Sequence, residues 1–324
     1  MGALRIFISE LAAGLALLCG AAAAAGAIAA QAGRENPMWD IAAHFAPAWV
    51  LLGLGALLLA LVSARGGVRW LALALSGLAM IAAGQLIGHE LLRPNSPRAE
   101  PTAPHQIKLI QFNAWRDNVD LDRAARWIAA QEPDVVVIQE GGPAVAAAMH
   151  RHGRWRAACE RCSVMIFSKD RLQKVRLQRP EGLALPSTVS ARLRAPDGGA
   201  YTVVGVHYTW PTNVRKHERQ VAGLTEALKP FPDDRLIVAG DFNSTPWSAA
   251  RRRQDAEFGL ERRTKALFTW PARTYERWGL TIGMPILPID HIYAGSAWRT
   301  VEVRRGPELG SDHYPVVARF TLAP

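Results

Sequence analysis

The sequence predicts an α/β domain that follows an N-terminal bundle of about three transmembrane helices. Long apolar stretches rich in Ala, Leu and Gly fill the first hundred of the 324 residues. The remaining residues alternate short β-branched runs with stretches of helical periodicity, a pattern typical of α/β folds. Polar residues follow several of the predicted strands, and these residues carry the functional argument.

Three apolar stretches, at about residues 11–30, 45–63 and 70–87, lie within a predicted transmembrane region over residues 1–92. Each approaches the roughly 20 residues that a helix needs to cross a bilayer. The first stretch has an alternative interpretation as a cleaved signal peptide, because Arg5 precedes it and sites resembling A-x-A follow it.

The distribution of arginines predicts the orientation in the membrane. Arg5, Arg65 and Arg69 flank the spans on one side, which is then cytoplasmic. An odd number of spans places the C-terminal domain outside the cytoplasm, although Arg93 and Arg98 lie on that outer side. We expect a multi-pass protein of the bacterial inner membrane whose C-terminal domain is periplasmic or extracellular.

A Pro-rich, polar segment at residues 93–104 is a predicted linker to the domain at 105–324. The domain holds 32 basic and 23 acidic residues, which favours a polyanionic substrate or an anionic membrane surface. Arginine clusters at 251–253 and 262–263 are expected mostly to form a solvated surface.

The three cysteines of the sequence do not predict a metal site. Cys19 lies in the first apolar stretch and is expected to act as a small apolar residue. Cys159 and Cys162 form a C-x-x-C pair, for which a local disulfide in an oxidising compartment is preferred to free thiols. A zinc site would require two further ligands, and the sequence has no second cysteine pair.

Two polar residues close the first strands of the domain. Strands at 108–115 and 134–140 flank a helix at 121–131, so Asn113 and Glu140 fall at neighbouring strand ends. A carboxylate that ends a Val-rich run is costly to bury without a partner. A metal ion is one such partner, and an arginine is the other.

Further strands at 163–169, 188–194 and 201–207 precede a helix at 213–229, and His207 ends the last of these strands. A buried strand then reaches Gly240 and is followed by Asp241 and Asn243. Side chains two apart in extended backbone point the same way, so this pair can hold a water, a metal or a phosphate oxygen. The alternative is an Asx turn that caps a helix beginning near Ser244.

Two Asp–His pairs lie near the C-terminus. Asp290 and His291 stand in an apolar strand, and Asp312 and His313 immediately precede the last strand. A hydrogen bond from an imidazole to a carboxylate orients the ring and raises its basicity.

Together these stretches resemble the endonuclease/exonuclease/phosphatase superfamily over roughly residues 105–322. The resemblance depends on Phe-Asn113, Ile-Gln-Glu140, His207, Gly-Asp241-Phe-Asn243, Ile-Asp290-His and Ser-Asp312-His313. It implies a four-layer αββα sandwich and hydrolysis of a phosphoester with Mg²⁺ or Mn²⁺. By the same resemblance, the metal ligands are Glu140, as the central one, with Asn113 and Asp312.

The resemblance also implies roles for five catalytic residues. Asp290 orients His313, which acts as a general base or binds the scissile phosphate. His207 and Asn243 bind phosphate oxygens, and Asp241 activates the attacking water or assists the leaving group.

The sequence favours a phosphodiesterase or nuclease that is held at the membrane. Trp115 stands where nucleases of the exonuclease III type often carry an acidic residue, which argues against repair of abasic sites. One alternative is a lipid phosphodiesterase or phosphatase similar to sphingomyelinase, and another is a non-catalytic binding protein. The expected partners are a phosphoester substrate, with nucleic acid or a lipid head group, and the membrane; no obligate protein partner is evident.

Overall fold

The computed structural model describes residues 2–232, 234–272 and 284–323, which form two compact units. The first unit comprises Met1–Arg93 together with Thr245–Arg252. The second comprises Pro94–Ser244 and Arg253–Pro324.

Three long helices that pack against one another dominate the first unit: α1 (Gly2–Gln31), α3 (Ala46–Ser63) and α4 (Gly66–Leu91). A short 3₁₀ turn, η1 (Ala32–Arg34), and α2 (Asp40–Ala43) connect α1 to α3. α1 and α4 extend beyond the apolar stretches from which they were predicted, whereas α3 nearly coincides with the stretch at 45–63. Among the described residues, these three helices are long and apolar enough to cross a membrane.

The first unit buries small residues and exposes large apolar ones. Ala16, Ala60 and Ala72 form a buried cluster between the helices. Leu18 and Val62, by contrast, are 70% and 83% exposed. Small residues allow helix backbones to approach closely, and large apolar side chains on the outside are stable in hydrocarbon rather than in water. This arrangement fits a membrane anchor.

The segment Thr245–Arg252 is held within the first unit by the connection between α1 and α3. The carboxylate of Asp40 accepts hydrogen bonds from the backbone N–H groups of Ala249 and Ala250, at 2.6 and 3.0 Å. It thereby satisfies free N–H groups at the start of α8 (Ala249–Glu257). The helix expected near Ser244 thus begins five residues later.

Two mixed sheets form the centre of the second unit, with six strands each within the described residues. In spatial order, the first sheet contains β11 (Trp298–Arg305), β12 (Val316–Leu322), β1 (Gln106–Asn113), β2 (Val135–Gln139), β4 (Val164–Ser168) and β3 (Arg156–Ala157). The second contains β5 (Gln173–Val175), β6 (Ser187–Arg194), β7 (Ala200–His207), β8 (Leu236–Asp241), β10 (Asp290–Ala294) and β9 (Glu261–Arg262).

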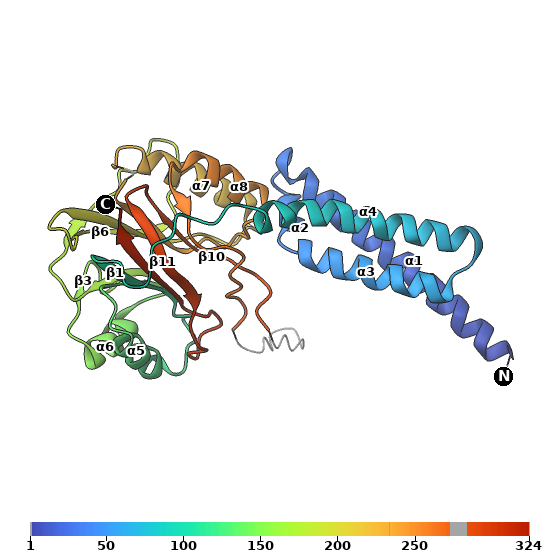
Figure 1. Cartoon of the computed structure of the whole chain (residues 1–324), viewed down its shortest axis with the longest axis horizontal. Helices are drawn as coiled ribbons and strands as arrows, with labels where there is room; N and C mark the ends of the chain where they lie inside the picture. The colour runs from blue at the N-terminus through green and yellow to red at the C-terminus, as the bar shows by residue number, and fades with distance from the viewer. Residues whose placement is uncertain (1, 233, 273–283, 324) are drawn as a thin grey trace. The chain divides into compact units, whose positions relative to one another are not determined.

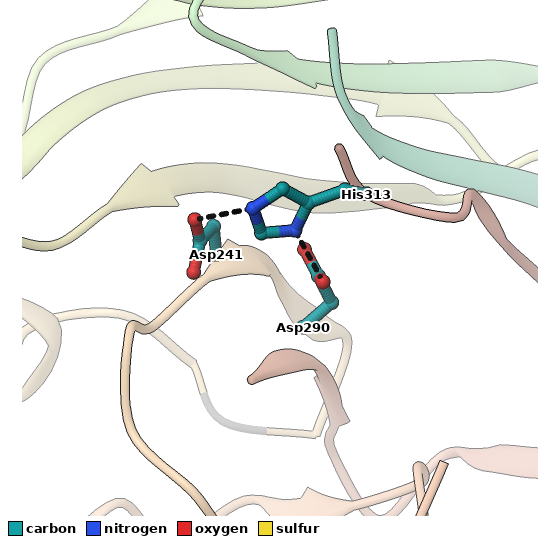
Figure 2. Close-up of side chains that lie close together, drawn as sticks. All are labelled: Asp241, Asp290 and His313. Atoms are coloured by element: carbon teal, nitrogen blue, oxygen red, sulfur yellow. Dashed lines mark hydrogen bonds and ion pairs between the residues drawn. The ribbon is translucent and has the colours of Figure 1, made fainter. Parts of the chain in front are cut away.

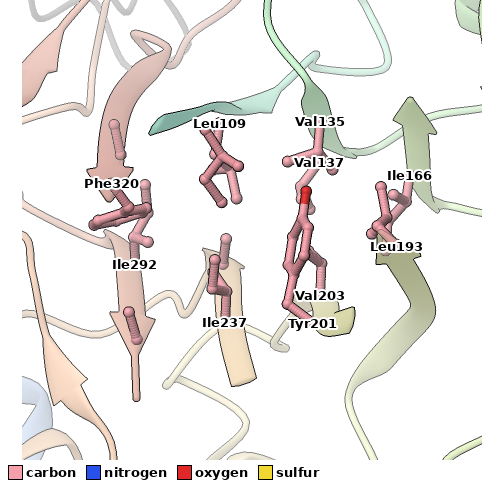
Figure 3. Packing of buried hydrophobic residues seen from close by; sticks show 14 of the residues in the cluster. Leu109, Val135, Val137, Ile166, Leu193, Tyr201, Val203, Ile237, Ile292 and Phe320 are labelled. Carbon is pink, nitrogen blue, oxygen red and sulfur yellow. The ribbon is translucent and has the colours of Figure 1, made fainter. Parts of the chain in front are cut away.

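The sheets pack face to face through alternate apolar residues. Leu109 and Val137 of the first sheet meet Ile237 and Val203 of the second in one buried cluster (Figure 3). On the outside, α5 (Leu121–Ala130) and α6 (Pro143–His152) cover the first sheet, and α7 (Val214–Leu228) covers the second (Figure 1). The predicted four-layer αββα sandwich is confirmed.

The structure also decides three smaller points. Cys159 and Cys162 form the disulfide that the sequence favoured. Part of the predicted linker pairs with a strand, because Ala99 N–H donates to the backbone oxygen of Thr300 at 3.0 Å. The arginine clusters at 251–253 and 262–263 do not form a mainly solvated surface, since Arg251, Arg262 and Arg263 are buried.

The close approach of β7 and β8 requires a glycine at position 240, directly before Asp241. A Cβ atom at this position would overlap the backbone oxygen of Val206 on β7. We expect Gly240→Ala to lower the free energy of unfolding by about 3 kcal/mol, a cost typical of overpacking. Thermal unfolding of the full chain in detergent, followed by tryptophan fluorescence, measures the change. Lys174→Ala on the exposed strand β5 is the control, with an effect within about 0.5 kcal/mol. Equal unfolding curves for Gly240→Ala and the wild type would contradict the packing argument.

Candidate active site

Strand register brings the candidate residues to one edge of the sandwich. Strands β1 and β2 are parallel, as are β7 and β8, so the polar residues at their C-terminal ends emerge on the same side. Asp241 lies opposite His207 on β7 and opposite Asp290 on β10. The sheet itself therefore assembles the centre of the site.

His313 connects two buried carboxylates. Its Nδ1 lies 2.8 Å from Oδ2 of Asp290, and its Nε2 lies 3.6 Å from Oδ2 of Asp241 (Figure 2). All three side chains are at most 4% exposed. Their ligand-type atoms lie within 4.8 Å of one another, a spacing that also suits a metal ion. The short bond between Asp290 and His313 instead indicates a carboxylate that orients an imidazole.

The two carboxylates determine the charge on His313. Burial alone would lower the pKa of this imidazole, but the negative charges of Asp290 and Asp241 outweigh burial and raise it to about 10. Burial raises the pKa of Asp241 to about 6, although the proximity of His313 opposes this shift. At neutral pH the histidine is therefore a cation, which disfavours it as a metal ligand because ligation requires a neutral imidazole.

Two glutamines in the centre of the first sheet complete the support of Asp290. Gln111 donates one hydrogen bond to Oδ1 of Asp290, at 2.8 Å, and another to Gln139, at 2.7 Å. Both glutamines are fully buried. Neither glutamine was assigned a role from the sequence, although a signal was present. Each is a polar residue within an apolar strand, and Gln111 lies two positions before Asn113, on the same face.

Glu140 and Asp312 offer carboxylate oxygens at the mouth of the site. Glu140 is 26% exposed, with a positive φ of 52°, and accepts hydrogen bonds from the N–H of Arg116 and from Asn113. In Asp312, Oδ2 accepts a hydrogen bond from the Trp270 indole, whereas Oδ1 is buried without a hydrogen-bond partner among the described residues. Burial raises the pKa of Asp312, and the negative charge of Glu140 adds to this shift. Neighbouring carboxylates with a free oxygen fit a hard cation such as Mg²⁺ or Mn²⁺.

Asn113 lies between the buried Asp241–Asp290–His313 group and the carboxylate of Glu140. Its Nδ2 is 3.3 Å from Glu140 and 3.1 Å from Oδ2 of Asp241. Its Oδ1 already accepts the N–H of Trp115 at 3.0 Å, which leaves one lone pair for a cation. Asn113 therefore positions both carboxylates, whether or not it also binds a metal.

The Asp241–Asn243 segment combines both interpretations of the sequence. Oδ1 of Asp241 accepts the N–H of Asn243 at 2.8 Å, which is an Asx turn, yet both side chains also face the site. The Asn243 amide donates to the backbone oxygen of Tyr208, and its Oδ1 is buried without a hydrogen-bond partner in the part of the chain that the structure describes. In this orientation Asn243 offers an acceptor, which suits a water or a cation better than a phosphate oxygen. His207, the remaining expected residue, lies 3.7 Å from Asp241 and 4.0 Å from Glu140.

One histidine faces away from the site, and one tryptophan borders it. His291 alternates with Asp290 along β10 and instead contacts the backbone oxygen of Ser244 at 2.9 Å. Trp210, which is 47% exposed, packs edge-to-face on Trp270 with ring centroids 5.8 Å apart. Since Trp270 bonds to Asp312, these two indoles form an aromatic wall next to the carboxylates.

Several solved structures share this fold. D. rerio TDP2, complexed with a single-stranded DNA product, superposes with a TM-score of 0.53 at 16% identity, over 67% of this chain and 99% of its own. A Bacteroides thetaiotaomicron mannosyl-6-phosphatase gives 0.51 at 13% identity, over 67% and 100%. The human Nocturnin catalytic domain, with a bound sulfate, gives 0.51 at 16% identity, over 70% and 96%.

The sequence comparisons complete the assignment. No curated protein matches the chain significantly. The model of the Endonuclease/Exonuclease/phosphatase family matches residues 110–313, which is more than half of the chain and spans every candidate residue. The chain therefore belongs to the Endonuclease/Exonuclease/phosphatase family.

Proposed function

We propose that this protein is a metal-dependent phosphoester hydrolase, most specifically a phosphodiesterase or nuclease. The observation that carries this proposal is the buried Asp290–His313–Asp241 arrangement beside Asp312, whose Oδ1 has no hydrogen-bond partner among the described residues. Members of the family are generally hydrolases of phosphoester bonds and typically depend on a divalent metal. The same chemistry is proposed for this chain.

In this proposal Glu140, Asp312 and Asn113 hold Mg²⁺ or Mn²⁺. When bound, the ion would offset negative charge on the phosphoryl group and on the leaving oxygen. The two carboxylates otherwise repel one another, and this repulsion adds to burial, the main cause of the raised pKa of Asp312.

The protein's own residues manage the protons and the phosphate. Unprotonated Asp241 accepts a proton from the attacking water, and Oδ1 of Asn243 accepts a hydrogen bond from the same water. His313, held as an imidazolium by Asp290, donates from Nε2 to a phosphate oxygen and stabilises the charge that develops there. His207, at the rim of the site, contacts a second phosphate oxygen.

The surroundings of the site favour a polyanionic substrate. The domain at 105–324 is strongly basic, and Trp210 presents a half-exposed indole near the carboxylates. Phosphate contacts and stacking of bases on aromatic rings are the usual terms in binding single-stranded nucleic acid. A lipid head group is the second candidate, because the apolar helices of the first unit fit a membrane anchor.

The proposed arrangement in the cell follows from the arginine distribution. Residues 1–92 cross the inner membrane, residues 93–104 form the linker, and residues 105–324 form a catalytic domain outside the cytoplasm. The Cys159–Cys162 disulfide supports this placement, because disulfides persist in oxidising compartments.

The first test is hydrolysis by the full chain in detergent with Mg²⁺ or with EDTA. The substrates are single- and double-stranded DNA, RNA, and vesicles of defined phospholipids. We expect cleavage of nucleic acid that EDTA abolishes and that added Mg²⁺ or Mn²⁺ restores. Cleavage of phospholipid alone would replace the nuclease assignment by the lipid one. No turnover of any substrate would favour a binding protein on the same fold.

Asp241→Asn tests the proposed base. Because an amide cannot accept the proton from water, we expect turnover to fall about 10²- to 10⁴-fold. Burial disfavours the charge on Asp241 whereas His313 favours it, so loss of this charge has two opposing effects and should change the midpoint of thermal unfolding little. Asp197→Asn, which breaks an exposed ion pair with Arg235, is the control and should retain full activity. Wild-type turnover in Asp241→Asn would remove this residue from the mechanism.

Asp290→Asn tests the orientation and charge of His313. Without this carboxylate burial dominates, so the pKa of His313 falls below about 10 and the imidazolium is lost as pH rises. We expect at least about 10²-fold lower turnover at pH 8, with part of it regained at lower pH. NMR titration of the His313 ring, assigned with His313→Gln, measures the pKa directly. An unchanged pKa and pH profile would contradict the proposed pair; Glu302→Gln on β11 is the control.

A further inference from the structure

The first unit contains a cavity that the proposed hydrolysis does not use. Its volume is about 670 Å³, and its walls come from the N-terminal half of α1, the C-terminal end of α3 and the start of α4. The hydroxyl of Ser9 on α1 donates to the backbone oxygen of Ser63 on α3 at 2.9 Å, which ties two of these walls together.

The lining of the cavity changes from charged to apolar. Arg5, Glu10 and Arg65 line it together with the apolar residues Leu17 and Val68. Along α1, the distance from Arg5 to Leu17 is about 18 Å at a rise of 1.5 Å per residue. The cavity thus has the dimensions and polarity of a lipid head group joined to the first part of an acyl chain.

The three charged side chains are available to a ligand. Arg5, Glu10 and Arg65 form no ion pair or side-chain hydrogen bond with the described residues of the chain. Two guanidinium groups suit one phosphate, since arginine binds phosphate through paired N–H donors. A nearby carboxylate suits a primary ammonium group and disfavours a second anion.

Gly14 provides room for the chain of such a ligand. It lines the cavity, and a Cβ atom built at this position meets no other atom within 4 Å. Glycine within a helix costs about 1 kcal/mol relative to alanine, so this opening is not explained by helix stability.

We infer that the cavity binds a bilayer glycerophospholipid whose head group joins a phosphate to a primary ammonium, as in phosphatidylethanolamine. Arg5 and Arg65 bind the phosphate, Glu10 accepts a hydrogen bond from the ammonium, and an acyl chain lies over Gly14 towards Leu17. This site is separate from the hydrolytic centre and does not depend on its chemistry. It needs only that α1, α3 and α4 lie in a bilayer.

Native mass spectrometry of the full chain in detergent tests the inference, with phosphatidylethanolamine, phosphatidylcholine and phosphatidylglycerol as probes. Phosphatidylcholine retains the phosphate but lacks N–H donors, and phosphatidylglycerol lacks the ammonium. We expect phosphatidylethanolamine to bind at least about tenfold more tightly than either, the effect of one charge-assisted hydrogen bond. Glu10→Gln should remove this preference, and Arg65→Gln should weaken binding of all three lipids at least about tenfold.

Matched variants separate this cavity from general lipid adhesion. Gly14→Leu should abolish tight binding, whereas Gly84→Leu should not, because Gly84 on α4 also has open space but lies outside the lining. Arg69→Gln, one helical turn after Arg65, is the charge control. Equal binding of the three lipids, or equal effects of Gly14→Leu and Gly84→Leu, would overturn the inference. Circular dichroism and thermal unfolding establish that each variant is folded.

Discussion

The hydrogen-bonded ion pair between Asp290 and His313 is the constraint on which the candidate-site edge of the sandwich depends. Charges at this depth are unfavourable unless they are paired and their remaining hydrogen-bonding capacity is used. Gln111 satisfies the second oxygen of Asp290, and Gln139 in turn binds Gln111. The polar network therefore extends from the site into both sheets and restricts how they can be aligned.

The same network explains why the first sheet tolerates polar residues at its centre. A buried amide group without a hydrogen bond costs about 1–3 kcal/mol, and the bonds of Gln111 avoid this cost for its Nε2 and for Oε1 of Gln139. Oε1 of Gln111 and Nε2 of Gln139 have no partner among the described residues. Among the described residues, the buried side-chain atoms without a hydrogen-bond partner include Oδ1 of Asp312 and Oδ1 of Asn243 at the candidate site. A cation, a water or a substrate at the site would satisfy these two acceptors.

The two units of the chain bury opposite kinds of apolar side chain. The sandwich buries large apolar side chains between sheets, with Phe320 and Ile237 fully enclosed. The helical unit encloses alanines and presents leucines outward. The helical unit would be unstable in water. Burial of alanine methyl groups contributes little hydrophobic free energy, whereas exposure of the leucine side chains to water is costly. In hydrocarbon the same arrangement allows close helix contact and favourable lipid contact.

Periodicity and residue type in the sequence were sufficient for most of the longer elements of the fold, but not for α6, β11 or the short strands β3, β5 and β9. They predicted the apolar helices and the strands that end in Asn113, His207 and Asp241, because these signals are local and strong. The resemblance to the family then supplied the four-layer architecture and the pairing of Asp290 with His313, which are separated by 22 intervening residues and could not be paired from spacing alone.

Tertiary structure decided what depends on contacts between distant segments. The burial of Arg251, the support of Asp290 by Gln111 and the capping of α8 by Asp40 all join residues whose proximity leaves no local signal. The orientation of the Asn243 amide and the cavity beside Gly14 also depend on contacts between distant segments. Local sequence thus determined the apolar helices and most of the central strands, because their periodicity is a local signal. Packing between distant segments determined where several elements end and which polar atoms are hydrogen-bonded.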